Sequence, residues 1–115
     1  MLYKVKNHHK KWLQKSAADA ELRFLPTEQV TESDLADVDA IIGNVPTELL
    51  PAAKKLRWLQ LNTAGADIYC KDGLLKDDVL LTNATGAYGL ALSEHLLAQL
   101  LAMMKKLYPY YDNQK

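Results

Sequence analysis

Residues 57–67 read RWLQLNTAGAD, a short apolar run that ends in an asparagine and is followed by small residues. The run is typical of a buried strand. Two further stretches have the same form, DAIIGN at 39–44 and VLLTN at 79–83, and each also contains an asparagine at its end. Helical segments separate the three runs. Because strands that alternate with helices form parallel sheets, the pattern predicts an α/β fold, a parallel sheet with helices on both faces.

Five strands alternating with helices are expected along the chain. Pro46 opens a helical segment that Pro51 should shorten or kink, because proline lacks a backbone donor and clashes with the preceding turn. Pro109 should end the last helix, since the residue before a proline avoids the helical region. The expected strands cover residues 2–6, 21–25, 39–44, 57–62 and 79–83, and the expected helices cover 8–20, a short segment within 64–70, and 91–107.

Length and composition are those of one globular domain, with 115 residues, 49% of them apolar. Fourteen basic and 14 acidic residues give zero net charge, which argues against nucleic acid or a membrane surface as a partner. No apolar run reaches the roughly 18–20 residues of a membrane span, and the N-terminus lacks the apolar core of a signal peptide. Cys70 is the only cysteine, so a reducing, cytoplasmic location is expected.

The three asparagines, Asn44, Asn62 and Asn83, should meet at one edge of the sheet. Ligands of open α/β sheets bind outside the carboxyl ends of the strands. Asparagine also caps helix N-termini, so three structural caps are the simpler interpretation. The loop at 63–66 is the best ligand-binding candidate, because its small residues allow close approach and its amides could hold a carboxylate without a charged side chain.

The helix expected at 91–107 is apolar around most of its circumference. Its polar residues form only a narrow strip, which includes His95 and Gln99. One face of a sheet can cover only one side of such a helix. We therefore expect the remainder to contact another domain or another subunit.

Three segments, in order, resemble the N-terminal part of the D-isomer-specific 2-hydroxyacid dehydrogenases. They are DAIIGN with VPTELL, then LRWLQLNTAGAD, then VLLTNATGAYGLALSEHLLAQLLAMMKKL. This family has a flavodoxin-like (Rossmann-like) substrate domain and an inserted domain that binds NAD(H) or NADP(H). The resemblance implies that residues 1–90 belong to the substrate-binding domain, 91–108 to the interdomain crossover helix and 109–115 to a tail, so that the fold is incomplete relative to the two-domain parent. The crossover helix commonly packs in the family's dimer interface, so a homodimer through 91–107 is implied.

The resemblance also implies a pocket for a small 2-oxo or 2-hydroxy acid, whose carboxylate the amides at 64–66 would hold. The family's G-x-G-x-x-G fingerprint and its catalytic arginine, glutamate and histidine have no counterpart in these 115 residues. The full-length oxidoreductase would transfer a hydride with NAD or NADP, whereas this chain alone is expected to be inactive and to bind no cofactor or metal. The implied substrate-binding residues are Asn44, Val45, Thr63, Ala64, Gly65, Ala66 and Tyr88.

Two other interpretations remain open. The chain could be a free-standing flavodoxin-like module that dimerises through its last helix, or part of a corepressor-like cofactor sensor. A receiver-type signalling domain is disfavoured, because asparagines stand at the strand ends where that class needs clustered acidic residues. The sequence does not distinguish NAD from NADP or one 2-oxo acid from another.

Overall fold

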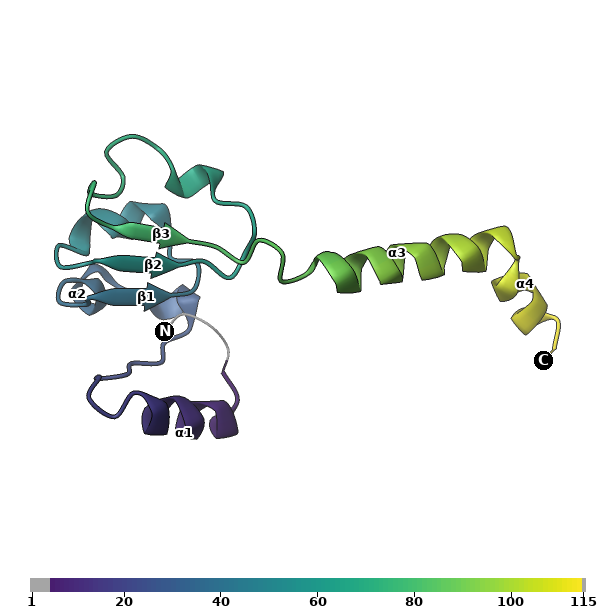
Figure 1. Ribbon diagram of the computed structural model, residues 1–115, viewed down its shortest axis with the longest axis horizontal. Helices are drawn as coiled ribbons and strands as arrows, with labels where there is room; N and C mark the ends of the chain where they lie inside the picture. The colour runs from purple at the N-terminus through teal and green to yellow at the C-terminus, as the bar shows by residue number, and fades with distance from the viewer. Residues whose placement is uncertain (1–4, 115) are drawn as a thin grey trace. The chain divides into compact units, whose positions relative to one another are not determined.

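The computed structural model describes residues 5–114 of the chain. The chain divides into two compact units, Met1–Ala84 and Thr85–Lys115. The first contains the sheet and the second contains two consecutive helices (Figure 1).

The sheet of the first unit has three parallel strands in the order β1-β2-β3. They are β1 (Ala40–Ile42), β2 (Trp58–Gln60) and β3 (Leu80–Thr82), and Figure 1 shows them side by side. Each lies within one of the three apolar runs that end in asparagine. The three parallel strands confirm the prediction of an α/β fold with a parallel sheet.

Short helical segments connect the strands. Thr31 precedes α2 (Glu32–Leu35), and its amide and hydroxyl donate to the Asp34 carboxylate at 3.0 and 2.6 Å, which fixes the helix start. The segment after Pro46 is a 3₁₀ helix, η2 (Thr47–Ala52), because Pro51 inside it cannot donate an α-helical hydrogen bond. The remaining elements of this unit are α1 (Asn7–Ser16), η1 (Thr27–Gln29) and η3 (Asp67–Tyr69).

A single apolar core lies on one face of the sheet. The register pairs Ile41 with Leu59 and Leu59 with Leu81, so the three side chains share that face. Leu59, on the central strand, has 0% of its surface exposed. Buried side chains from α2, η2 and η3 complete the core, and α2 and η2 pack against each other. The buried residues are Val30, Leu35, Ile41, Val45, Leu50, Ala53, Leu56, Leu59, Leu61 and Tyr69.

The opposite face of the sheet is only partly exposed in the first unit, where Ile42, Gln60 and Thr82 are half-buried. Side chains alternate along a strand, so Trp58 and Leu80 point away from the core. They are 38% and 60% exposed.

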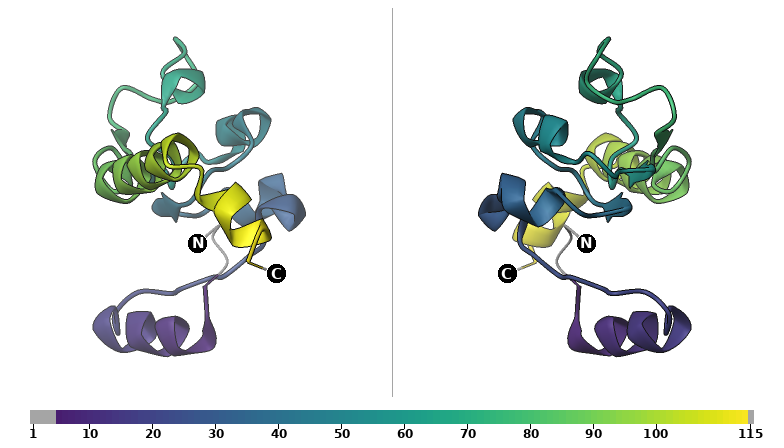
Figure 2. Two further views of the ribbon diagram at one scale, coloured as in Figure 1. Left: turned by 90° about the vertical axis from the view of Figure 1, so that its right-hand side faces the viewer. Right: turned by 90° about the vertical axis from the view of Figure 1, so that its left-hand side faces the viewer.

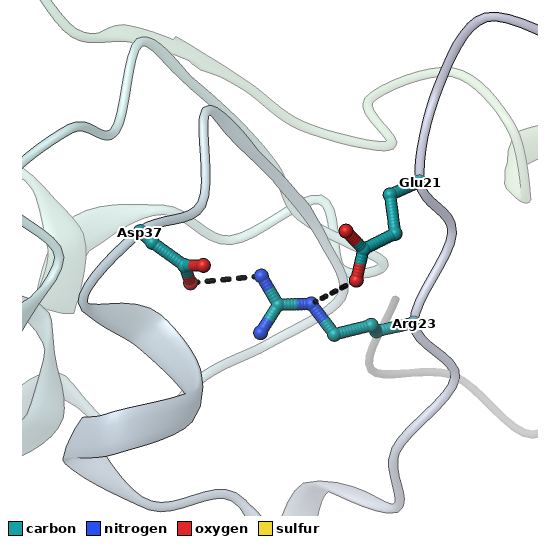
Figure 3. Close-up of polar contacts among 3 residues, drawn as sticks. All are labelled: Glu21, Arg23 and Asp37. Carbon is teal, nitrogen blue, oxygen red and sulfur yellow. Dashed lines mark hydrogen bonds and ion pairs between the residues drawn. The ribbon is translucent and has the colours of Figure 1, made fainter.

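The strand expected at 21–25 is wrong, because residues 21–26 have no regular secondary structure. This segment is instead held by Arg23, whose guanidinium contacts Asp37 at 2.8 Å and Glu21 at 3.4 Å (Figure 3). The strand expected at 2–6 falls mostly outside the described residues, and positions 5 and 6 are not in a strand. The first helix ends at Ser16, four residues earlier than expected.

The second unit contains α3 (Gly89–Met104) and α4 (Leu107–Asp112), whose axes differ in direction in Figures 1 and 2. Lys106 separates them, with a left-handed φ of 53°. The long helix therefore ends before Pro109, not at it. Pro109 lies in the first turn of α4, where a missing amide hydrogen breaks no helical bond.

Candidate functional site

Side chains link the three loops at the carboxyl edge of the sheet. The Asn44 side-chain amide donates to Thr63 Oγ1 at 3.0 Å, and the Asn44 oxygen accepts the backbone N–H of Asn62 at 2.9 Å. The Asn83 side-chain amide donates to the carbonyl of Ala64 at 2.6 Å. The loops after β1 and β3 thus both hold the loop after β2.

These bonds assign the asparagines a different role from helix capping. The N-cap residues of η2, η3 and α3 are Pro46, Ala66 and Tyr88, and none of these helices has a side-chain cap hydrogen bond. The capping interpretation is therefore wrong. Asn44 and Asn83 instead hold the loop after β2. A short sequence motif does not indicate such a contact between distant residues.

The central loop at 63–66 presents backbone groups rather than charged side chains. The Thr63 hydroxyl donates to the Gly65 carbonyl at 3.0 Å, and the Ala84 amide donates to the Thr63 carbonyl at 3.0 Å. Within the described part of the chain, the amides of Ala64, Gly65 and Ala66 donate no hydrogen bond. Three neighbouring unpaired amides are a source of positive potential for an anion.

Gly65 has room around it. A Cβ added at Gly65 meets no atom within 4 Å, and its φ is not in the left-handed region. Neither packing nor backbone strain within this chain therefore requires glycine here. The absence of a side chain leaves the backbone of an exposed loop open to close approach.

Val45 lies in the core rather than on the surface of the edge. It is 1% exposed, and its carbonyl accepts the Tyr69 hydroxyl at 2.8 Å. Burial raises the pKa of the Tyr69 hydroxyl, Asn44 opposes this shift, and the Glu48 carboxylate adds to it. Tyr69 thus anchors the end of η3 to the loop after β1. The sequence does not indicate this role of Tyr69, because its hydrogen-bond partner lies 24 positions away along the chain.

A hollow of about 470 Å³ lies next to the central loop. Its lining contains no charged side chain. An anion bound in this hollow would be stabilised by amides and by side-chain dipoles. The lining residues are Ala66, Cys70, Leu81, Thr82 and Asn83.

Tyr88 belongs to the second unit and is considered by itself. It is the N-cap of α3 and is half exposed. Of the other expected site residues, Asn44, Thr63 and Gly65 are linked by hydrogen bonds, Ala64 is bound by Asn83, and Ala66 lies in the wall of the adjacent hollow.

The side chains that join the loops of this edge in the four hydrogen bonds above are the amides of Asn44 and Asn83 and the hydroxyl of Thr63. Among residues 5–114, no group of three histidine, cysteine or acidic side chains could hold a metal ion. Over the same residues, no helix has both the length and the apolar character that crossing a membrane requires.

Comparison with protein families, with curated proteins and with solved structures finds no match to this chain.

Proposed function

We propose that the chain is the N-terminal part of an NAD(P)-dependent oxidoreductase that interconverts 2-oxo acids and D-2-hydroxy acids. In this proposal, the loop at 63–66 holds the substrate carboxylate. Asn44 and Thr63 belong to the neighbouring wall of the pocket, and Tyr88 lies near the interdomain cleft. Val45 is buried in the core and is not assigned to the wall. The order of the three motifs in the sequence supports the family assignment.

The observation that carries the proposal is the set of three unpaired amides at Ala64, Gly65 and Ala66. They follow the central strand of a parallel sheet, at the edge where α/β folds bind ligands. Asn44 and Asn83 hold their loop from both sides. A loop that is already fixed loses little conformational freedom when it binds.

The strand order is compatible with the flavodoxin-like part of the proposal. A flavodoxin-like sheet has the order 2-1-3-4-5, in which three consecutive strands lie side by side. The order β1-β2-β3 has this form. The proposal assigns hydride transfer, acid-base catalysis and the nicotinamide cofactor to residues outside this chain, and expects no turnover from the chain alone.

The test is a titration of the ¹⁵N-labelled chain with pyruvate, followed through its amide resonances. The amides at 64–66 should shift and saturate, because the carboxylate accepts hydrogen bonds from them. Pyruvamide, which lacks the carboxylate, should produce no saturable shift at these positions. NADH should produce none either.

Gly65→Ala provides the matched variant. The added methyl group meets nothing in the chain, so the fold should be retained, while pyruvate binding should weaken at least fivefold because the methyl group occupies the approach to the backbone. Gly89→Ala is the control, since a Cβ at Gly89 also meets nothing within 4 Å. Equal pyruvate affinity of the two variants, or shifts that avoid 64–66, would refute the carboxylate loop.

A second candidate function is favoured by α3. None of its residues is buried, which is typical of a helix that associates with another surface. The chain would then be a flavodoxin-like binding or dimerisation module, or part of a corepressor-like cofactor sensor. A concentration-dependent dimer that gives no pyruvate-dependent shift at 64–66 would favour this candidate.

A further inference from the structure

The hollow beside the central loop adjoins the amides that are proposed to hold a carboxylate. Ala66 belongs both to the loop at 63–66 and to the wall of the hollow. Asn83 also lines the hollow, and its side-chain amide donates to the carbonyl of Ala64 at 2.6 Å. All the lining residues belong to the first unit. A small molecule whose carboxylate lies on the loop amides would therefore have the rest of its structure next to this space.

The polar side chains in the wall of the hollow are already hydrogen-bonded within the chain. The Thr82 hydroxyl accepts the Trp58 indole N–H at 2.8 Å and donates to Gln60 Oε1 at 2.6 Å. The Asn83 side-chain amide is bound to the loop. An apolar group that enters the hollow therefore leaves neither the Thr82 hydroxyl nor the Asn83 amide without a partner, so the usual penalty for displacing water is small.

The remainder of the wall is apolar or only weakly polar. It consists of Ala66, Cys70 and Leu81. Ala66 and Leu81 are half-buried, and a cysteine thiol behaves as a small apolar group with a weak donor. Contact with these three side chains removes apolar surface from water, which favours a hydrocarbon group on the ligand.

A charged group on the ligand has no counter-charge in this hollow, because none of the lining residues is acidic or basic. The adjacent hollow shares Cys70 and Leu81 with it. That second hollow contains Lys71 but also Asp72 and Asp77, so it offers no net positive charge either. Removing a carboxylate from water without a partner is unfavourable. A second carboxylate on the ligand should therefore weaken binding.

The size of the hollow suits a short group. Its volume of about 470 Å³ lies in the lower half of the range for ligand pockets, roughly 300–1,000 Å³. Ala66 and Cys70 flank η3 as its N-cap and C-cap residues. Two residues four positions apart in a 3₁₀ helix are separated by roughly 8 Å along its axis. A hydrocarbon group of a few carbon atoms can extend between them.

We propose that the ligand of the loop at 63–66 is a monocarboxylic 2-oxo or 2-hydroxy acid with a short hydrocarbon side chain, and that this side chain lies against Ala66, Cys70 and Leu81. The choice of ligand rests on the proposed function, because the loop must hold the carboxylate for the side chain to reach the hollow. Cys70 and Leu81 thus determine specificity through contact and take no part in the chemistry of the reaction.

The test compares three acids that differ in the group attached to the oxo carbon. Pyruvate has a methyl group, 4-methyl-2-oxopentanoate a branched hydrocarbon group, and 2-oxoglutarate a group of similar size that ends in a carboxylate. The ¹⁵N-labelled chain is titrated with each acid. All three should shift the amides at 64–66, whereas only 4-methyl-2-oxopentanoate should also shift the amides of Cys70 and Leu81.

The affinities should follow the character of the side chain. A fully buried methylene group strengthens binding about fourfold, so the three additional carbon atoms of 4-methyl-2-oxopentanoate, partly buried, should make its dissociation constant about tenfold lower than that of pyruvate. The dissociation constant of 2-oxoglutarate should be about tenfold higher than that of 4-methyl-2-oxopentanoate or more, because its second carboxylate loses water without gaining a partner.

Two lysine substitutions provide matched variants. Cys70→Lys places a cation in the hollow and should reverse the ranking, so that 2-oxoglutarate binds more tightly than 4-methyl-2-oxopentanoate. Ile68→Lys adds the same charge two positions away, but Ile68 is 56% exposed and does not line the hollow. It should leave the ranking unchanged, and circular dichroism checks that both variants fold.

The possible outcomes separate the choice of ligand from the proposed function. No saturable shift at 64–66 with any of the three acids would refute the carboxylate loop, and the choice of ligand with it. Shifts at 64–66 with equal affinities for 4-methyl-2-oxopentanoate and 2-oxoglutarate would support the carboxylate loop but overturn the hydrocarbon side chain. A Cys70→Lys variant that keeps the ranking of the unchanged chain would also overturn it.

Discussion

Tyr69→Phe removes one hydroxyl from the core and should test how the carboxyl edge is held together. The hydroxyl donates at 2.8 Å to the carbonyl of Val45, and both residues are buried, at 3% and 1% exposed. Phenylalanine keeps the ring but leaves the Val45 carbonyl without this donor. Leaving a buried acceptor unsatisfied costs about 1–3 kcal/mol of unfolding free energy.

The same substitution should change the alkaline stability. Burial raises the pKa of Tyr69, so above the ordinary tyrosine pKa of about 10 the folded chain holds this proton more tightly than the unfolded chain. The free energy of unfolding contributed by this group is fully present below pH 10 and is lost as the pH rises through the folded-state pKa. Tyr69→Phe should therefore show a shallower loss of stability above pH 10.

Urea unfolding followed by tryptophan fluorescence measures both effects. With a urea dependence of about 1–1.5 kcal/mol/M, a loss of about 2 kcal/mol lowers the midpoint by roughly 1.5 M. Tyr110→Phe is the matched control, because Tyr110 is 61% exposed. It should change the stability by less than about 0.5 kcal/mol.

Two results would refute the reasoning. One is a midpoint for Tyr69→Phe that equals that of Tyr110→Phe at pH 7.5. The other is an alkaline slope that Tyr69→Phe leaves unchanged, which would mean that Tyr69 ionises with the same pKa in the folded and unfolded chain.

The remaining predictions concern the core and the charged surface. Leu59→Ala should lower the free energy of unfolding by about 3–5 kcal/mol, because Leu59 is fully buried on the central strand. Leu80→Ala on the opposite face should lower it by less than about 1 kcal/mol. Equal urea midpoints of the two variants would contradict the assignment of the two faces. The Arg23 guanidinium holds the pKa of Asp37 below its ordinary value, so the contribution of Asp37 to stability is present above pH 4 and is lost as the pH falls through its folded-state pKa. Asp37→Asn should therefore unfold less steeply in acid than the unchanged chain, and 0.5 M NaCl should reduce the difference between them; a difference that salt does not affect would show that the ion pair is not its source.

The sheet could be predicted from local sequence because its three strands are marked by local features. Each of the runs at 39–44, 57–62 and 79–83 contains one observed strand, although every strand has only three residues. Alternation with helical segments was enough to predict parallel pairing. The position of Asn44, Thr63 and Asn83 at one edge then follows from parallel pairing alone, and the structure confirms it.

Local sequence failed where a long-range partner decides the structure. The apolar residues at 21–25 have the composition of a strand, but this segment has no regular secondary structure and Arg23 binds Asp37 instead. Pro109 was expected to end a helix, yet the backbone turns earlier, at Lys106, and the proline is accommodated in a new first turn. Secondary-structure propensity states which conformations a segment can adopt. Contacts with the rest of the chain decide which of these conformations it takes.

The sequence by itself determined the three strands of the observed sheet, their parallel direction, the small-residue loop at 63–66 and the apolar character of α3. Only the tertiary structure decided which face of the sheet is buried, because the register of Ile41, Leu59 and Leu81 depends on pairings between residues 18 to 22 positions apart. It also decided that Asn44 binds the loop after β2 rather than capping its own helix. The physical reason is that strand character is a property of a few neighbouring residues, whereas burial and side-chain pairing exist only once distant segments have met.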